Sequence, residues 1–464
     1  MDWTHILSDY WGPDFQLRGQ QPEIVSALLN RRDVLALLPT GEGKSLCFQL
    51  AGLTLKGLTL VISPLVALMQ DQVQGLQAKG IPVAWLHGQL NRYQRDQLLQ
   101  RARQQTGFIY LSPELLQSPQ VQAFFSRFPP GLLVIDEAHC ISQWGHDFRP
   151  DYRRIPDFIQ ALPQRPVIGA FTATAPPEIA ADIVQLLGLS EPLQVRGKPL
   201  QAHIYLRIQP CWTPWGKWRQ LLRQLKPKTL IYANTRQETE QLARRLQARL
   251  SCPVLMYHAG CPAPRRQQAL ESFATLSEGV MVATKAFGMG IDIGDIERVI
   301  HWQLPESLSA YVQEVGRAGR NRQVEASAVL LRLWGEPFGV ALCPLRADHI
   351  WTVLRALQRG SSLPALRQRY QLPDAHLNQI LLPLERQGCL QSEAHLLQLD
   401  DSPLRPLFSL IWRESRAILD QHKAARRLLA QYCQTRHCRR TFLYRAFALT
   451  PEADCDRCDR CQPS

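Results

Sequence analysis

The sequence predicts an α/β protein built from two parallel β-sheets that are covered by helices. Three observations support this fold class. Strand-sized apolar runs alternate with helical stretches, a glycine-rich loop follows the first run, and two adjacent carboxylates follow a later one. Such alternation is typical of parallel sheets, because each return between parallel strands needs a crossover that is usually a helix.

The predicted strands fall into two groups. The first lobe has strands at Val34–Leu38, Thr59–Ser63, Phe108–Ser112, Leu132–Asp136 and Val167–Thr172. The second lobe has strands at Thr229–Asn234, Val254–His258, Val280–Thr284 and Arg298–Trp302. The rhythm breaks between Gly188 and Lys228, where prolines crowd a Trp-rich segment, so we place the lobe boundary near Lys198.

A different pattern begins after Leu333. Apolar residues recur at helical spacing from Ile350 to Leu357 and from Leu377 to Leu384, and Gly388 is a plausible helix C-cap. We expect the helices of a small domain here.

Composition limits the class of protein. The 464 residues are 45% hydrophobic, but no apolar run approaches the roughly 20 residues of a membrane span. The N-terminus lacks a secretion signal, so we expect a cytoplasmic, nucleoid-associated protein without membrane contact. The formal charge of +13 favours a polyanionic partner, although charge alone is weak evidence.

The loop between Pro39 and Ser45 predicts a nucleotide-phosphate site. Its glycines allow backbone N–H groups to approach phosphate, and the following helix directs its positive end toward the anion. Lys44 would reach the β- and γ-phosphates, and Ser45 would bind Mg²⁺. Leu38 replaces the first glycine of the strict pattern, so the match is to Thr-Gly-x-Gly-Lys-Ser and not to the full consensus. The candidate ATP contacts are Thr40, Gly41, Glu42, Gly43, Lys44 and Ser45.

Asp136 and Glu137 supply the second half of this site. The strand before them would deliver both carboxylates to the carboxyl edge of the sheet, where ligands bind in open α/β folds. Asp136 suits a Mg²⁺ ligand, and Glu137 suits the group that orients and deprotonates the attacking water. Together with the loop, they predict an ATP-hydrolysing motor.

These motifs resemble the RecQ family of superfamily 2 helicases. The most diagnostic stretch is Asp136-Glu-Ala-His-Cys-Ile-Ser-Gln-Trp-Gly-His-Asp-Phe-Arg-Pro150, which is similar to a DEAH box that continues into the family's aromatic-rich loop. Also similar are Leu17-Arg-Gly-Gln-Gln21, Ser63-Pro-Leu65, Phe171-Thr-Ala-Thr174, Ala286-Phe-Gly-Met-Gly-Ile-Asp292 and Gln313-Glu-Val-Gly-Arg-Ala-Gly-Arg320. The resemblance implies two RecA-like lobes, ATP-driven 3′→5′ translocation on DNA, and a role in recombination and repair.

The resemblance also assigns residues that bind the nucleotide. Gln21 can pair with adenine and Arg18 could stack on the ring, the alternative being a solvated turn. Arg317 and Arg320 are spaced to share a helix face and would stabilise charge on the γ-phosphate in the transition state. An interlobe salt bridge is the structural alternative. The family usually continues with Asp-Gly, where this chain has Asn321-Arg322.

The aromatic-rich loop offers a DNA contact. Trp144, Phe148 and Arg149 carry ring faces and a guanidinium on which unpaired bases can stack. Core packing of the Trp144 and Phe148 rings is the alternative. The resemblance implies that this loop links DNA occupancy to hydrolysis.

Four cysteines near the C-terminus predict a zinc site. Cys455, Cys458 and Cys461 are closely spaced, and Cys438 lies upstream, just before Arg439 and Arg440. Four thiolates suit tetrahedral Zn²⁺. Disulfides are a rival, and Cys433 or His437 could replace Cys438 as the fourth ligand. The basic excess of residues 401–464 favours a nucleic-acid contact by this module.

About 100 residues separate the motor from Cys438. They could form a winged-helix-like domain or a helical spacer; Pro383 counts against a straight recognition helix. We therefore expect RecA-like lobes at 1–197 and 198–335, an insert at 336–404 and a zinc module at 405–464.

The implied ligands are ATP, Mg²⁺, Zn²⁺ and DNA, both single-stranded and forked. A single-strand-binding protein or a topoisomerase is a partner implied by resemblance alone. The rival hypotheses are a DEAH-type RNA helicase, which would lack the Trp144 loop and the Cys438 module, and a DNA-binding scaffold with an inactive motor. Intact Lys44, Asp136, Glu137 and Arg320 argue against the scaffold.

Overall fold

The computed structural model describes the chain except residues 1–2, 40, 56, 65, 104–106, 143–149, 174, 289–292, 322, 337–343, 394–395, 452–454 and 463–464. The chain divides into two compact units. One comprises residues 1–339 and 428–464, and the other comprises residues 340–427.

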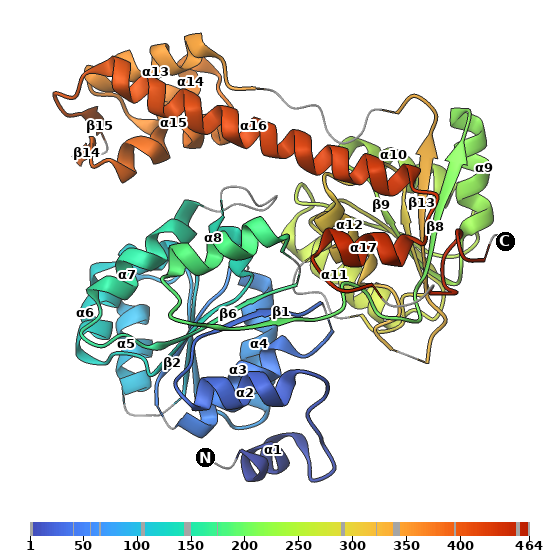
Figure 1. Ribbon diagram of the computed structural model, residues 1–464, viewed down its shortest axis with the longest axis horizontal. Helices are drawn as coiled ribbons and strands as arrows, with labels where there is room; N and C mark the ends of the chain where they lie inside the picture. Colours follow the sequence, from blue (N-terminus) through green and yellow to red (C-terminus); the bar gives the residue numbers. More distant parts are fainter. Residues whose placement is uncertain are drawn as a thin grey trace. The chain divides into compact units, whose positions relative to one another are not determined.

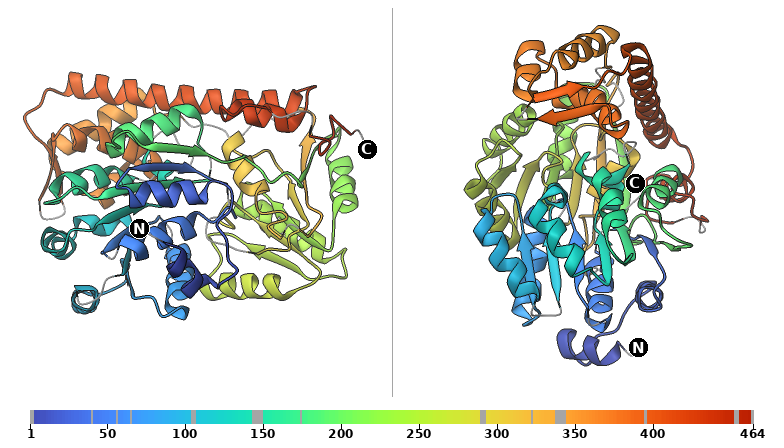
Figure 2. Two further views of the ribbon diagram at one scale, coloured as in Figure 1. Left: turned by 60° about the horizontal axis from the view of Figure 1, so that its bottom comes forward. Right: turned by 90° about the vertical axis from the view of Figure 1, so that its left-hand side faces the viewer.

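The first lobe is a seven-stranded sheet in the order β3-β4-β2-β5-β6-β1-β7, and every pairing in it is parallel. Its strands are β1 (Val34–Leu37), β2 (Thr59–Ile62), β3 (Val83–Leu86), β4 (Phe108–Leu111), β5 (Leu132–Ile135), β6 (Val167–Thr172) and β7 (Leu193–Arg196). Helices cover both faces of the sheet (Figures 1 and 2). Successive side chains of β2 therefore enter different cores: Leu60 and Ile62 pack on one face and Val61 on the other.

The helices of this lobe lie between its strands or before them. They are α1 (Thr4–Trp11), α2 (Gln21–Leu29), α3 (Lys44–Leu55), α4 (Val66–Ala78), α5 (Arg92–Arg103), α6 (Pro119–Arg127), α7 (Ile155–Ala161) and α8 (Pro177–Leu187), with 3₁₀ turns η1 (Pro113–Gln117), η2 (Ala138–Ile141) and η3 (Pro150–Arg154).

The second lobe is a six-stranded parallel sheet in the order β10-β11-β9-β12-β13-β8. Its strands are β8 (Tyr205–Cys211), β9 (Lys228–Tyr232), β10 (Val254–Tyr257), β11 (Gly279–Ala283), β12 (Arg298–His301) and β13 (Ser327–Leu333). Its helices are α9 (Pro214–Gln224), α10 (Arg236–Gln247), α11 (Ala263–Thr275) and α12 (Leu308–Val315). The two predicted parallel sheets are confirmed.

One expectation about this region is wrong. The segment between Gly188 and Lys228 continues the strand rhythm, because it contains β7, β8 and α9. Both strands lie at sheet edges, and their burial alternates or is partial. A strand with one open side needs no continuous apolar run, so the sequence pattern did not reveal it.

The unit of residues 340–427 has its own core. Helices α13 (Ala347–Gln358), α14 (Leu363–Tyr370) and α15 (Asp374–Arg386) precede the antiparallel pair β14 (Leu390–Glu393) and β15 (Leu396–Leu399). An isolated bridge joins Ser361 to Leu397. Pro383 lies inside α15, and Gly388 follows that helix with φ +71°, as expected of a C-cap glycine.

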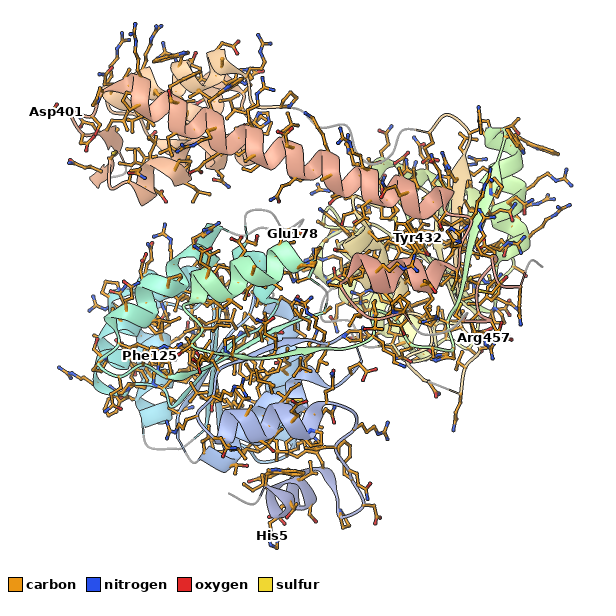
Figure 3. The ribbon with its side chains drawn as sticks, viewed as in Figure 1. His5, Phe125, Glu178, Asp401, Tyr432 and Arg457 are labelled. Atoms are coloured by element: carbon orange, nitrogen blue, oxygen red, sulfur yellow. The ribbon has the colours of Figure 1, made fainter. Side chains whose placement is uncertain are left out.

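The chain ends in α16 (Leu404–Gln434), α17 (Arg439–Ala446) and a cysteine-rich tail. Leu407 and Ile411 at the start of α16 belong to the core of the 340–427 unit. Tyr432, labelled in Figure 3, projects from the other end of α16 into the core of the second lobe.

Candidate functional site

The glycine-rich loop and the carboxylates meet at the carboxyl edge of the first sheet, as predicted. Gly41 and Gly43 have φ of +86° and +71°, a conformation that favours glycine. Lys44 begins α3, and its Nζ is buried with no hydrogen-bond partner among the described residues. Such an ammonium fits a phosphate ligand, because a buried cation needs an anion close by.

Asp136 lies at the end of β5 and is 3% exposed. Its Oδ2 accepts a hydrogen bond from Ser63 Oγ at 3.3 Å, and its Oδ1 accepts one from the Glu137 amide at 3.0 Å. Burial and the Glu137 carboxylate raise the pKa of Asp136 to about 6, against the opposing effect of the Lys44 ammonium. The carboxylate is therefore poised to gain a cation.

Glu137 is held in a left-handed backbone conformation, with φ +49°, which is uncommon outside glycine. Its Oε2 lies 3.3 Å from His139 Nδ1, and the same nitrogen lies 2.7 Å from Thr172 Oγ1 at the end of β6. The Tyr152 hydroxyl fixes the turn by donating to the Asp136 carbonyl at 2.8 Å. Strained backbone of this kind clusters at functional sites.

Gln21 is tied to the loop that it was predicted to assist. Its Nε2 donates to the Glu42 carbonyl at 2.9 Å, and its Oε1 accepts from the Arg18 amide at 2.8 Å. A Cβ at Gly43 would lie 2.4 Å from Gln21 Nε2. The amide thus braces the phosphate loop, and pairing with adenine would require it to exchange these partners.

The expectation that Arg317 and Arg320 share a helix face is wrong. Helix α12 ends at Val315, and both arginines lie in the turns that follow. Arg317 is 2% exposed and hydrogen-bonds the Tyr232 hydroxyl. Arg320 is partly exposed, and its Cγ lies 3.9 Å from where a Cβ of Gly41 would stand. Gly316 caps the helix at Val315, so helical spacing does not set the directions of the two side chains.

The four predicted zinc cysteines come together. The sulfurs of Cys438, Cys455, Cys458 and Cys461 all lie within 4.8 Å of one another. The Sγ distances of 3.4 Å for Cys438–Cys455 and 3.6 Å for Cys458–Cys461 exclude disulfides, and a tetrahedral zinc with Zn–S of about 2.3 Å places sulfurs roughly 3.8 Å apart. Cys433 and His437 lie outside this cluster.

The zinc module is joined to the second lobe by buried polar contacts. Arg440 donates to the carbonyls of Leu200, Gln201, Ala202 and Ile204. Arg439 is 1% exposed and forms a two-pronged ion pair with Asp459, whose Oδ2 also accepts from the Ile208 amide of β8. These two arginines stabilise the module and are not available to DNA phosphates.

An aromatic contact reaches from this module to α12. The Tyr432 hydroxyl lies 3.3 Å from that of Tyr311, and both side chains are fully buried. The Tyr311 ring packs against His301, whose Nε2 lies 2.8 Å from Glu314 Oε2. The module therefore contacts the helix that precedes the two arginines.

The predicted DNA contacts Trp144, Phe148 and Arg149 lie outside the described residues, as does Thr40.

Three family descriptions match the chain. "DEAD/DEAH box helicase" matches residues 18–183, "Helicase conserved C-terminal domain" matches 216–322, and "RecQ zinc-binding" matches 410–462. The ATP-dependent DNA helicase RecQ of Synechocystis is 37% identical, and the match covers 98% of this chain and 97% of that protein. The chain belongs to the RecQ family. A probable ATP-dependent DNA helicase RecS of Bacillus subtilis is 39% identical, over 78% of this chain and 74% of that protein.

Solved structures share the RecQ chain's fold. The protein Mss116p bound to single-stranded RNA and AMP-PNP has a TM-score of 0.60 at 15% identity, covering 93% of this chain and 94% of that one. The expected fold class, two RecA-like lobes with a helical C-terminal region and a zinc-binding module, is confirmed. Among the described helices, none has an apolar stretch long enough to span a bilayer.

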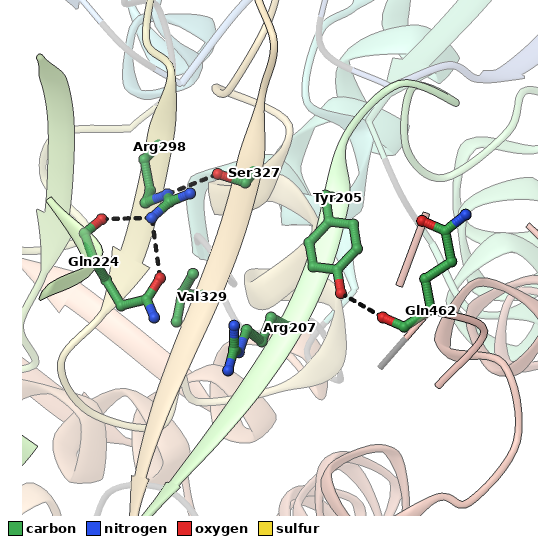
Figure 4. Close-up of a pocket in the computed structure, with 7 residues that line it drawn as sticks. All are labelled: Tyr205, Arg207, Gln224, Arg298, Ser327, Val329 and Gln462. Carbon is green, nitrogen blue, oxygen red and sulfur yellow. Dashed lines mark hydrogen bonds between the residues drawn. The ribbon is translucent and has the colours of Figure 1, made fainter. Parts of the chain in front are cut away.

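A pocket of about 410 Å³ opens elsewhere on the second lobe of this RecQ protein (Figure 4). Arg298 there donates to Ser327 Oγ and to Gln224, and Tyr205 donates to the Gln462 carbonyl. Burial lowers the pKa of Arg298. None of the predicted site residues lines this pocket; its polar groups join β12 to β13 and α9, and join β8 to the zinc module.

Proposed function

We propose that this chain is an ATP-dependent DNA helicase that couples hydrolysis to 3′→5′ translocation and duplex unwinding in recombination and repair. The observation that carries the proposal is the buried Lys44 ammonium beside the Asp136–Glu137 pair, because this arrangement suits an anionic phosphate and a water-activating base. We assign DNA as the substrate because the RecQ and RecS relatives are named as DNA helicases. Polarity and pathway rest on family resemblance.

In this proposal each residue has one task. Lys44 and the loop amides bind the phosphates, and Glu137 orients water and takes its proton, with His139 and Thr172 fixing its direction. Ser45 and Asp136 would hold Mg²⁺, which neutralises charge on the phosphates when bound. Arg320, beside Gly41, would stabilise charge on the γ-phosphate, and Arg317 would support it from its buried position.

The experiment that tests the proposal compares ATP turnover without nucleic acid, with single-stranded DNA, with duplex DNA and with RNA. We expect stimulation by single-stranded DNA well above that by RNA. Stimulation by RNA alone would establish the DEAH-type RNA helicase instead. Absence of turnover under all four conditions would establish the inactive scaffold.

The four-part domain division and the localisation near DNA also remain proposals. So does zinc binding by Cys438, Cys455, Cys458 and Cys461, which the sulfur cluster supports.

A further inference from the structure

Three tryptophans of the second lobe are largely exposed. Trp212 and Trp334 are each 71% exposed, and Trp215 is 66% exposed. An aromatic side chain of this size is usually buried or used in recognition, and a single exposed one needs no explanation. Three exposed tryptophans, two of them stacked on each other and the third only three residues from Trp212, do need an explanation.

Trp212 and Trp334 form a preorganised pair. Each directly follows a strand, and Leu333 of β13 is in register with Cys211 of β8. The Trp334 amide donates to the Cys211 carbonyl at 2.7 Å, and the two rings stack with centroids 5.0 Å apart and planes 28° from parallel. The buried Lys217 ammonium braces the turn after β13 by binding Glu336 at 2.9 Å. The pair is held by the sheet and does not depend on a loose loop.

The surroundings of the pair are basic. From Trp212 to Gln237 the chain has six Lys or Arg residues and no Asp or Glu; Lys217 and Lys228 are buried and paired with carboxylates, and the other four are exposed. Arg219 is exposed on α9, and its guanidinium lies 4.7 Å from the Trp215 ring centroid; Arg236, which begins α10 after β9, is exposed at the carboxyl edge of the same sheet. Exposed rings with guanidinium groups match the bases and phosphates of an unpaired strand.

The position of the pair also suits a ligand. In a parallel sheet all strands end at one edge, so Trp212 and Trp334 lie at the edge from which the segment before α12 leaves β12. Ligands of open α/β sheets bind at this edge. Helix α9, which carries Trp215 and Arg219, lies beside β8 at the outer side of the lobe (Figure 1).

We propose that Trp212, Trp334 and Trp215, with Arg219, form a stacking site for the unpaired bases of a single nucleic-acid strand, distinct from the Trp144 loop of the first lobe. This proposal rests on the proposed function, because it assumes that the partner is nucleic acid. It adds a sequence-independent contact that holds the strand on the second lobe.

The test measures binding of a fluorescein-labelled 20-residue oligo-dT to the full chain without ATP. We expect Trp212→Ala/Trp334→Ala to raise Kd about 5-fold or more, because the double variant loses at least one stacking contact between a base and an aromatic ring. Trp212→Phe/Trp334→Phe should retain most of the affinity, because phenylalanine keeps a ring face. Arg219→Gln should lower the slope of log Kd against log salt by about 0.7, one phosphate contact.

Tyr93→Ala is the matched control, since Tyr93 is a 70% exposed aromatic on α5 of the first lobe. Unchanged Kd in the tryptophan double variant, with intrinsic fluorescence quenched by oligo-dT as in the wild type, would overturn the site. The wild type could instead form a dimer that the same variant abolishes while DNA affinity is retained. That result would make this surface a contact between copies of the chain and would also overturn the stacking site. ATP turnover that single-stranded DNA stimulates in the wild type keeps the proposed function standing in both cases.

Discussion

At the scale of single residues, the protonation of Asp136 depends on its neighbours. The folded pKa of about 6 lies above the ordinary value of 3.8, so the folded protein holds this proton more tightly than the unfolded chain does. The ionised form therefore costs stability near pH 7; this cost begins to fall as the pH drops below about 6 and is gone below the ordinary value of 3.8. Because a cation must compete with the proton, we expect kcat/KM for Mg-ATP to fall as the pH drops below about 6.

Two substitutions should move this midpoint in opposite directions. Glu137→Gln removes the negative charge that raises the pKa of Asp136, so the midpoint for Mg-ATP binding should fall. Ser63→Ala removes a hydrogen bond that stabilises the carboxylate, so the midpoint should rise. Binding of a fluorescent ATP analogue with Mg²⁺ between pH 5 and 8 would check both. Equal midpoints in all three proteins would mean that another group controls binding.

Lys44→Ala and Glu137→Gln should both abolish turnover, by different routes. The first loses the phosphate contact. Because a charge-assisted hydrogen bond contributes roughly 1.5–3 kcal/mol, ATP binding should weaken by at least about 10-fold. The second should keep ATP bound while water is not activated, with turnover reduced by about 100-fold or more. Filter binding and phosphate release measure the two effects. Wild-type hydrolysis by Glu137→Gln with single-stranded DNA present would remove Glu137 from this role.

The sequence predicted the residues that lie within one motif, and it did not predict their partners on other strands. Lys44 and Asp136 were found from local spacing. The contacts of Asp136 with Ser63, and of His139 with Thr172, join the ends of β5, β2 and β6. Such pairs depend on strand order, which residue spacing in a single sequence does not specify.

At the scale of elements, the zinc-binding tail completes an edge of the second sheet. Cys458 is fully buried and forms an isolated bridge with Leu206 of β8, the edge strand. We expect Cys458→Ser to lose a zinc that the wild type holds at one per chain, and to lower the unfolding temperature by several degrees, because structural zinc contributes folding energy. Metal analysis and thermal unfolding measure this.

Cys252→Ser is the control, since Cys252 is a partly exposed thiol outside the sulfur cluster. The assignment would be contradicted if Cys458→Ser unfolded at the wild-type temperature, or if the wild-type protein contained no zinc. The sequence predicted this cluster because its spacing is local. The edge strand that the tail completes was missed, since β8 alternates in burial within a proline-rich segment.

At the scale of the whole molecule, the insert folds as a unit of its own. The expected amphipathic helices correspond to α13 and α15, and between them lies α14, which the periodicity did not reveal because only Leu366 of its residues is buried. Three helices followed by a β-hairpin, with Ser361 bridging to β15, is the element order of a winged helix. This order favours the winged-helix hypothesis over a helical spacer.

The last prediction concerns DNA binding by this unit. Arg367 and Arg369 are exposed on α14; Arg386 ends α15, and its side chain lies outside the described part of the chain. If they neutralise phosphates, replacing all three by alanine should weaken binding to a forked duplex by about 10-fold and lower its salt slope by roughly 2 to 3, with little change for single strands. Arg346→Ala is the control, because that exposed arginine already pairs with Asp348 at 2.8 Å. Fork affinity and salt slope that stay unaltered while unwinding persists would make the unit a spacer, and duplex melting would then belong to the two lobes and the zinc module.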